Sequence, residues 1–324
     1  MLPILRGSTL SSKVRLGITL QNYFASDDYI SFKELLETAK LAEDLGFHSV
    51  WVWDHLVLGS RKYFPIHESY VVLSAVAAHT TRVRLGTGVY LLTLRNPLAV
   101  AKQLTAIDHL SGGRITFGVA AGWYEKEFKA SGVPFNKRGE ILVKYVNIIK
   151  RLLTEDYVDG VYNGLQFDKV RLEPKPVQKP HPPIWLGGYV EKALERVGMI
   201  GDGWVSYFYT PSSFRKSWEK IQGYANKHGR SGEKLDNCVM VPALVDETRD
   251  SAMKKVNSYV SRYCDLPPWS EASVDSAVAG SRDECLLQVE RYRESGVREL
   301  VLVPVFESPK QVNERVREIG RALL

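Results

Sequence analysis

Cysteine is scarce in this sequence, and the three cysteines present, Cys238, Cys264 and Cys285, lie far apart along the chain. An odd number at such wide spacing argues against a disulfide framework and against a zinc site built from cysteines. The histidines and acidic residues likewise show no spacing typical of metal ligands. We therefore expect no metal site.

Long hydrophobic runs are also missing. The longest apolar stretch near the C-terminus covers residues 300–306, which is far too short to span a bilayer. Residues 1–13 contain no extended apolar run of the kind found in signal peptides. These absences predict a soluble, cytoplasmic protein that does not contact membranes.

Neither sign of charge dominates the chain. Its 324 residues include 43 Lys and Arg and 37 Asp and Glu, a net charge of +6, and the basic residues are dispersed among the acidic ones. Nucleic-acid-binding proteins usually cluster their basic residues, so we expect no nucleic-acid partner. The mild positive excess suits an anionic small molecule. Hydrophobic residues make up 44% and charged residues 25% of the chain, which excludes a disordered protein.

Short β-branched or aromatic runs alternate with helical patterns along the chain. Several runs, such as residues 50–53 and 300–303, are apolar on both faces, as parallel strands covered by helices require. The predicted strands are Arg15–Leu20, His48–Trp53, Arg84–Val89, Arg114–Val119, Ile184–Leu186, Gly203–Ser206, Val239–Val245 and Glu299–Val303. Eight strands alternating with helices predict a (β/α)8 TIM barrel, with residues 1–324 as a single domain. A doubly wound open sheet is the structural alternative.

Capping residues mark the starts of several helices between these strands. A serine followed three residues later by Glu or Gln forms a capping box. Asn or Thr directly before proline is a second signal, because Asn or Thr is a good N-cap and proline is tolerated in the first turn of a helix. The predicted starts are Ser31 with Glu34, Asn96-Pro97, Thr210-Pro211, Ser281 with Glu284, and Ser308-Pro309 with Gln311. Gly46 is expected to end the first of these helices.

Two regions are predicted to be insertions into the barrel. Residues 156–173 contain Asp159-Gly160 and Asn163-Gly164 between apolar residues, which indicates a hairpin outside the barrel. Five prolines between residues 173 and 183 then force an extended path, which we expect to cross the barrel floor and enter the fifth strand. The second insertion, residues 267–280, precedes the last strand.

Polar and glycine residues gather where the predicted strands end, and TIM barrels carry their active sites at these ends. Asp54-His55 is the evident acid–base candidate; the alternative is that Asp54 caps a turn and His55 is partly solvated. The candidates from all strand ends are Gln21, Asn22, Asp54, His55, Gly88, Val89, Ala120, Ala121, Gly122, Trp123, Gly187, Gly188 and Ser206.

Two glycine pairs at strand ends have different expected roles. Gly187-Gly188 precedes a predicted helix, where glycine lets a phosphate reach backbone N–H groups; the alternative is a plain turn. Ser206, at the end of the next strand, would add a hydroxyl to this phosphate site. Gly86-Thr87-Gly88 has no helix after it, so we expect its backbone to lie close against a flat ligand.

In this order, these residues resemble the bacterial luciferase-like family of flavin and deazaflavin oxidoreductases. The resemblance is dense over residues 14–204 and loose over the C-terminal third. The matching stretches are residues 42–47, 50–55, 84–89, 95–97, 108–114, 121–128, 132–135, 172–178 and 184–188.

The resemblance implies a TIM-barrel enzyme that binds a flavin-like ring at the barrel mouth. One branch of the family uses coenzyme F420 for hydride transfer, and the other uses reduced FMN and oxygen. Asp54-His55 resembles the F420 branch, in which the aspartate contacts the ring and the histidine can act in proton transfer. Trp123 stands where the sugar-phosphate dehydrogenases of that branch place a glutamate, so Trp123 is expected to be a pocket wall. The family often has a non-proline cis peptide behind the ring, which here would be Gly88-Val89.

These implications assign a role to each candidate. The expected cofactor-binding residues are Asp54, Gly88, Val89, Ala121, Gly122, Gly187, Gly188 and Ser206, and the expected substrate pocket is Gln21, Asn22 and Trp123. His55 and Asp54 are the expected catalytic residues.

Three functions stay open on this basis. The leading hypothesis is an F420-dependent oxidoreductase that transfers hydride to or from a small organic substrate. The alternatives are an FMNH2-dependent monooxygenase and, from a different class, a non-catalytic flavin-binding protein. The family usually dimerises, and Trp51, Trp53, Tyr70 and the helices after the second and third strands are apolar enough to suggest a buried face, so we also expect a homodimer.

Overall fold

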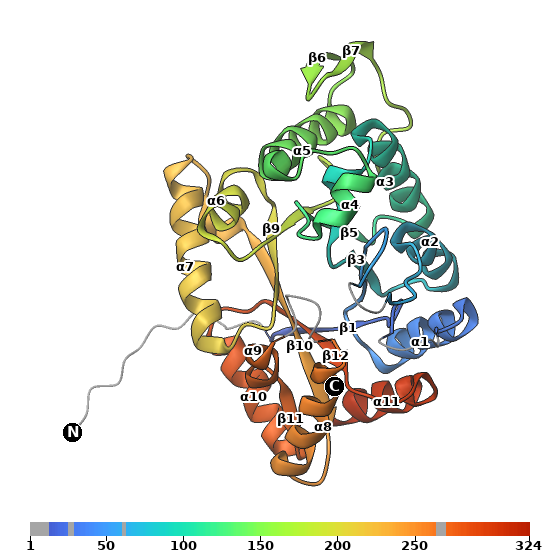
Figure 1. Ribbon diagram of the computed structural model, residues 1–324, viewed down its shortest axis with the longest axis vertical. Helices are drawn as coiled ribbons and strands as arrows, with labels where there is room; N and C mark the ends of the chain where they lie inside the picture. Colours follow the sequence, from blue (N-terminus) through green and yellow to red (C-terminus); the bar gives the residue numbers. More distant parts are fainter. Residues whose placement is uncertain (1–12, 25–28, 60–62, 264–269) are drawn as a thin grey trace, which may run out of the picture.

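Eight parallel strands pair edge to edge into a closed barrel, and helices surround it (Figure 1). The computed structural model describes residues 13–24, 29–59, 63–263 and 270–324. Cys264, the start of the predicted insertion at residue 267 and all but one of residues 1–13 lie outside these residues.

The strands of the barrel follow one another in the order β12, β1, β2, β3, β5, β8, β9 and β10, and the ring closes because β10 pairs with both β9 and β12. Their bounds are β1 (Arg15–Thr19), β2 (Ser49–Val52), β3 (Arg84–Thr87), β5 (Ile115–Ala120), β8 (Ile184–Gly187), β9 (Gly203–Tyr207), β10 (Asp236–Val245) and β12 (Glu299–Pro304). Each of the eight predicted runs coincides with one of these strands, with small differences at the ends. The barrel is confirmed, and closure removes the open-sheet alternative.

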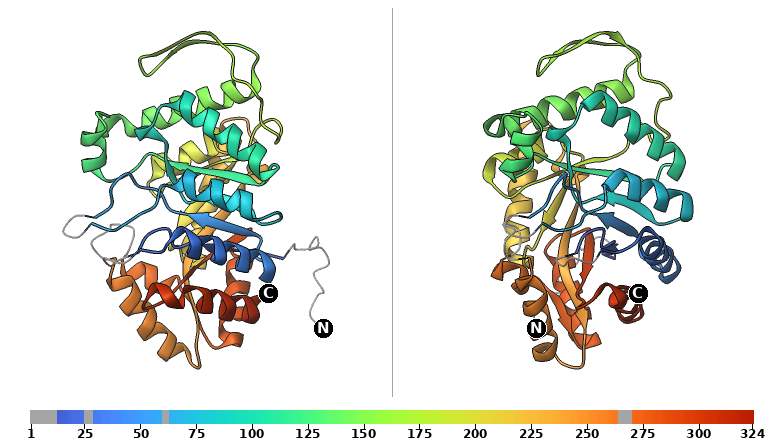
Figure 2. Two further views of the ribbon diagram at one scale, coloured as in Figure 1. Left: turned by 90° about the vertical axis from the view of Figure 1, so that its right-hand side faces the viewer. Right: turned by 45° about the vertical axis from the view of Figure 1, so that its right-hand side comes forward.

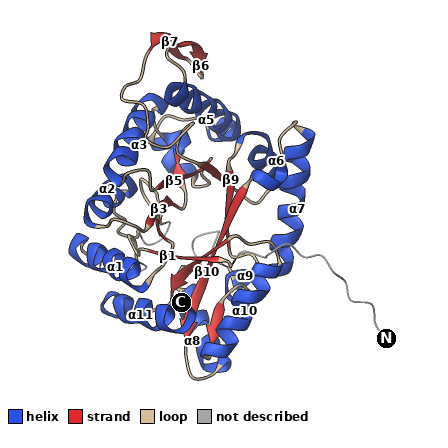
Figure 3. Ribbon diagram, turned by 180° about the vertical axis from the view of Figure 1, so that it is seen from behind, coloured by secondary structure: helices blue, strands red, loops and turns tan. Residues whose placement is uncertain are grey.

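Helices cover the outside of the strands on all sides (Figure 3). They are α1 (Phe32–Leu45), α2 (Ser69–His79), α3 (Pro97–Ser111), α4 (Glu125–Ala130), α5 (Arg138–Thr154), α6 (Glu191–Ile200), α7 (Pro211–Lys227), α8 (Arg249–Ser261), α9 (Glu271–Asp275), α10 (Arg282–Glu294) and α11 (Val312–Leu323). The predicted capping boxes begin α1 and α10, and the predicted N-caps begin α3 and α7. Ser308 differs slightly, because it begins a short 3-10 turn that leads into α11.

The hairpin predicted after α5 is present and projects away from the barrel (Figures 1 and 2). Its strands, β6 (Val158–Tyr162) and β7 (Leu165–Val170), pair antiparallel. Asn163 and Gly164 form the two-residue turn, and both have positive φ, as a type I′ turn requires. Asp159-Gly160 lies inside β6 instead, where the pairing register shifts.

The proline run lies at the amino ends of β3 and β5, on the floor of the barrel. Its Gln178 donates from the side chain to the Ile115 carbonyl at 2.8 Å and from its backbone N–H to Asp108 at 2.9 Å. The later insertion contributes α9 and the short strand β11 (Val278–Gly280), which pairs with the end of β10. A second short strand, β4 (Tyr90–Leu91), pairs with β5.

The barrel interior is filled by side chains, among them the buried Trp51. The Trp51 indole N–H lies 2.8 Å from Ser49 Oγ and 3.0 Å from Glu299 Oε1, and burial raises the pKa of Glu299. A Cβ on Gly86 would lie 2.3 Å from this ring, so glycine there makes room for a core tryptophan. The expectation that Gly86 serves a flat ligand is therefore corrected.

Two of the three apolar residues expected to form an interface are internal, and the third, Trp53, lines the cavity described below. Trp51 is 2% exposed inside the barrel, and Tyr70 is 5% exposed between α2 and the strands, where it packs edge-on against Tyr90. Burial within one chain, and not a second copy, explains their apolar character.

Among the described residues, Cys238 and Cys285 are buried free thiols. No described helix is long and apolar enough to cross a membrane. Within the same part of the chain, no group of three or more His, Cys, Asp or Glu residues is arranged to hold a metal ion.

Candidate active site

A cavity of about 840 Å³ opens at the carboxyl ends of the barrel strands. It is near the upper end of the size range of small-molecule sites, roughly 300–1,000 Å³. The predicted residues that line it are Asp54, His55, Gly88, Val89, Ala120, Ala121, Gly122, Trp123, Gly187 and Gly188. The fold thus gathers most of the predicted site around one cavity.

Gln21, Asn22 and Ser206 are not among the lining residues. The Asn22 amide donates to the Trp53 carbonyl at 2.8 Å and accepts from the Trp53 N–H at 2.9 Å, so it positions the end of β2. Gln21 is buried and donates to Thr19 Oγ1 at 2.8 Å. These contacts favour supporting roles for both residues.

Ser206 and Tyr207 point to opposite faces of β9, because successive side chains of a strand alternate. The Ser206 hydroxyl is fully buried and donates to the Cys238 carbonyl at 2.9 Å. It shares its face with Trp204, which stacks on Phe214 of α7. Tyr207 lines the cavity instead, and is the residue of this strand end that could touch a ligand.

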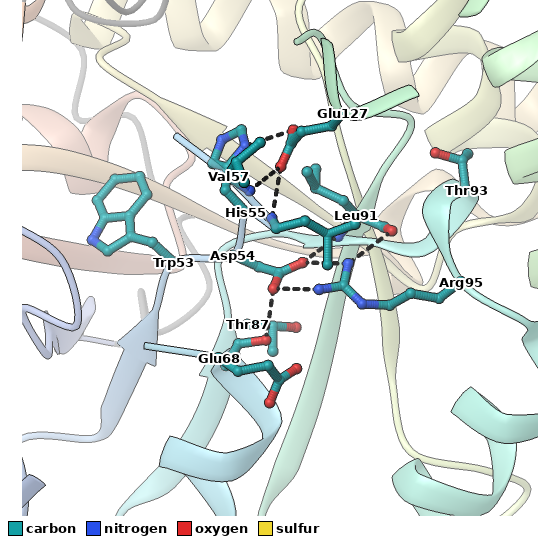
Figure 4. A network of polar contacts seen from close by, with 12 residues as sticks. Trp53, Asp54, His55, Val57, Glu68, Thr87, Leu91, Thr93, Arg95 and Glu127 are labelled. Carbon is teal, nitrogen blue, oxygen red and sulfur yellow. Dashed lines mark hydrogen bonds and ion pairs between the residues drawn. The ribbon is translucent and has the colours of Figure 1, made fainter. Parts of the chain in front are cut away.

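His55 is held by a buried carboxylate that the sequence analysis did not single out, that of Glu127 on α4 (Figure 4). His55 Nδ1 lies 2.9 Å from Glu127 Oε2, and the Glu127 side chain is fully buried. A carboxylate accepts hydrogen bonds only, so Nδ1 carries the proton in this pair. Nε2 has no partner among the described residues and remains available at the cavity.

Glu127 also shapes the loop that follows His55. Its Oε1 accepts the backbone N–H groups of Leu56 at 2.6 Å and Val57 at 3.1 Å. One carboxylate therefore fixes both the ring and the backbone beside it. In the sequence, nothing in the residue spacing distinguishes Glu127 from the exposed Glu125 nearby. The contact between Glu127 and His55 could therefore not be predicted from the sequence.

Asp54 lines the cavity but is committed to other partners. Its carboxylate accepts from Arg95 Nη2 at 2.8 Å, from Ser69 Oγ at 3.1 Å and from the Leu91 N–H at 2.8 Å, and the residue is 3% exposed (Figure 4). Burial by itself would lower the pKa of Arg95, but the charge and hydrogen bond of Asp54, together with Tyr90 and Glu68, outweigh burial and raise this pKa. These contacts indicate that Asp54 holds the backbone at Leu91 in place. Contact between Asp54 and a ring stays a prediction from resemblance.

We expect Asp54→Ala to lower the free energy of unfolding by about 3 kcal/mol, because it leaves the Arg95 cation buried and unpaired. The loss of the bond to Leu91 should also weaken cofactor binding. Chemical denaturation and cofactor titration measure the two effects. The control is Asp44→Ala, since Asp44 forms an exposed ion pair with Lys40. Equal stability of the two variants would contradict the supporting role.

The backbone between β3 and β4 forms one wall of the cavity. Its Gly88-Val89 peptide bond is cis, as the resemblance predicted. A Cβ on Gly88 would lie 2.2 Å from Met240 Cε, so the backbone lies directly against the barrel core. Val89 is also a lining residue and offers an apolar surface to a ligand.

A group of cations lines another part of the cavity, around the start of α6. Lys192 and Arg196 belong to α6, and Arg138 begins α5. Arg138 donates to the Phe135 carbonyl at 2.9 Å, and neither arginine forms an ion pair among the described residues. Burial, and then the charge of Arg138, lower the pKa of Arg196. Arg138 also donates from Nε to the Gly122 carbonyl at 3.2 Å, and Arg196 packs against Gly139. The sequence analysis did not identify these cations because they come from separate helices.

Comparison with known proteins places these features in context. A family model described as luciferase-like monooxygenase matches residues 8–319. An uncharacterised protein of Mycobacterium tuberculosis is 32% identical over 187 residues, which cover 52% of this chain and 65% of that protein. The chain thus spans less than two thirds of that relative. The 4-hydroxyprotoasukamycin monooxygenase of Streptomyces nodosus subsp. asukaensis is 26% identical over 295 residues, covering 83% of this chain and 79% of the relative.

A solved structure has a similar fold. It is an F420-dependent secondary alcohol dehydrogenase in complex with an F420-acetone adduct, with a TM-score of 0.80 and 21% identity. The match covers 97% of this chain and 100% of the other.

Proposed function

The chain belongs to the luciferase-like monooxygenase family, and we propose that it is an oxidoreductase that uses coenzyme F420 to move hydride to or from a small organic substrate. The observation that carries this proposal is the His55–Glu127 pair, a histidine with a fixed tautomer at the edge of the cavity. The similarity to an F420-dependent alcohol dehydrogenase supports the same assignment.

The residues around the cavity suit a deazaflavin. Val89 would lie against one face of its ring, and Arg138, Arg196 and the start of α6 beside Gly188 would hold its phosphate. The positive helix end and the two guanidinium groups favour an anion there. Bound F420 supplies a ring carbon that accepts or donates hydride.

His55 would move the proton that hydride transfer requires. When an alcohol loses a hydride from carbon, its hydroxyl must also lose a proton, and a positioned histidine is a suitable acceptor. Because Nδ1 is bound to Glu127, the proton arrives at Nε2, and Glu127 stabilises the resulting imidazolium. In the opposite direction, Nε2 returns the proton to the carbonyl oxygen.

A monooxygenase that uses FMNH2 and oxygen is the second candidate. The relative from Streptomyces nodosus favours it, because that protein is named a monooxygenase and shares most of its length with this chain. A phosphate site of the kind described above would suit FMN equally well. A non-catalytic flavin-binding protein is the third reading and would leave the His55–Glu127 pair without a reaction.

Cofactor titration separates the candidates. We expect F420 fluorescence to be quenched at lower concentration than FMN fluorescence, and a panel of alcohols to reduce bound F420. Binding of FMN alone, with oxygen consumption in the presence of FMNH2 and a substrate, would instead establish the monooxygenase. Binding without turnover of any substrate would favour the non-catalytic reading.

We also propose that the protein forms a homodimer through α2 and α3, which pack side by side (Figure 1). Large apolar side chains are exposed on these helices: Val71 at 57%, Leu98 at 38% and Leu110 at 50%. Light scattering should give twice the chain mass of 36.6 kDa. Val71→Glu should shift the mass toward the monomer, and a wild-type monomer at micromolar concentration would contradict the proposal.

A further inference from the structure

Charged groups are unevenly distributed around the cavity. Among the described lining residues, the charged side chains of α5 are Arg138 and Glu140, and those of α6 are Lys192, Glu195 and Arg196. Away from these two helices the lining contains one formal charge, that of Asp54, and Arg95 neutralises it. An anionic part of a ligand therefore finds its cations at α5 and α6.

The rest of the lining includes a set of aromatic and apolar side chains, which we call the aromatic wall: Tyr23, Trp53, Leu58, Trp123 and Tyr207. The rings of Trp53 and Tyr207 stack with centroids 5.3 Å apart and planes 26° apart, and Tyr23 packs edge-on against Trp53 at 5.6 Å. Tyr207 ends β9, Trp53 directly follows β2, and Tyr23 lies in the loop after β1, where its backbone bridges to Ile66.

His55 belongs to the same part of the cavity. Its ring meets the Trp123 ring edge-on, with centroids 5.4 Å apart. The proton-transfer group thus lies beside aromatic surface, and Arg138, the lining cation of α5, is already bonded to the Gly122 and Phe135 carbonyls. A substrate that reaches Nε2 is therefore in contact with apolar side chains.

We propose that the substrate is an uncharged alcohol, or the carbonyl compound formed from it, that carries a flat apolar group seated on the aromatic wall. This inference rests on the proposed function. While His55 is neutral, a carboxylate or phosphate on the substrate would lose its hydration against this wall without gaining a cation, which is costly. A planar group gains both apolar burial and ring stacking there.

The reaction balances with the groups named. In the oxidation, the C–H bond of the carbinol breaks and its electron pair leaves with the hydrogen to oxidised F420. The O–H proton passes to His55 Nε2, and the C–O bond becomes a carbonyl. The substrate is oxidised by two electrons, and the deazaflavin is reduced by two.

A matched pair of ketones tests the substrate class. Acetophenone and benzoylformate both carry a phenyl ketone, but benzoylformate has a carboxylate where acetophenone has a methyl group. We expect calorimetric titration of the F420-loaded protein to show at least tenfold tighter binding of acetophenone. Equal or tighter binding of benzoylformate, or no binding of either ketone, would overturn the inference.

Variants locate the binding surface. Trp53→Leu should weaken acetophenone binding about tenfold and leave F420 affinity unchanged, and Trp53→Phe should restore most of the loss. Trp218→Leu is the control, because this buried tryptophan of α7 lies outside the cavity lining. Thermal melting confirms that each variant is folded. Equal ketone affinity in the wild type and Trp53→Leu would overturn the assignment.

Failure of the proposed function has a separate signature. If F420 does not bind, the cofactor titration shows it before any ketone is added, and the same ketone pair is then compared on FMN-loaded protein. A preference for acetophenone there would uphold the aromatic wall as the substrate surface and overturn the F420 assignment alone.

Discussion

Replacing His55 with alanine should lower kcat by a hundredfold or more, within the range of roughly 10²–10⁴ typical of general acid–base groups. The loss arises because Nε2 is the group at the cavity placed to exchange the substrate proton. F420 affinity should change little, since the proposed phosphate site is built from α5, α6 and Gly188 and does not include His55. Steady-state kinetics and fluorescence titration measure the two quantities separately.

The Glu127–His55 contact supplies a stringent control. Glu127→Gln removes the charge that orients the ring, so it should also lower kcat. The double variant His55→Ala/Glu127→Gln should lose no more activity than His55→Ala, because Glu127 acts through the histidine. His79→Ala, an exposed histidine at the end of α2, should retain full activity. Near-full activity of His55→Ala would return His55 to a loop-bracing role.

Gly188→Val should weaken F420 binding by roughly a hundredfold or more. Gly188 has a φ of 146°, a conformation that side-chain-bearing residues rarely adopt, and a Cβ there would lie 2.5 Å from the Cβ of Ala193. Overpacking and backbone strain at the valine would cost about 1–3 kcal/mol each, and the turn would relieve this cost by leaving its present geometry. The valine would also displace the start of α6 from the phosphate.

Fluorescence titration and circular dichroism together test this prediction. The fold should persist, because the strained turn lies at the barrel mouth and not in the core. Gly223→Val serves as the matched control, since a Cβ at Gly223 on α7 meets no atom within 4 Å. If Gly188→Val bound F420 as tightly as Gly223→Val, the phosphate would have to lie elsewhere.

The barrel and its boundaries could be predicted from local sequence signals. Residues 50–53 are apolar on both faces because helices cover one side of β2 and the barrel core fills the other. Ser31 and Glu34 encode the start of α1 within a single turn, and Asn163-Gly164 encodes the hairpin turn in two residues. Such signals need only neighbours along the chain, which is why they were recognisable.

Position at a strand end was a sound guide to the cavity, but it did not give the direction of each side chain. Ser206 and Tyr207 are adjacent in sequence, and only the pleat of β9 in the closed barrel assigns Tyr207 to the cavity. The prediction that Trp51 is buried was likewise correct. Its place inside the barrel, however, depended on the small Gly86 of the neighbouring strand.

The sequence by itself therefore determined the eight strands, the helix caps, the hairpin and the strand ends that line the cavity, because each depends on local pattern. Only the tertiary structure decided the partners: Glu127 for His55, Arg95 for Asp54, and Arg138 beside Arg196. These contacts join residues from separate elements of the barrel. Electrostatic and hydrogen-bond energies depend on distance and burial, and the folded chain alone sets both.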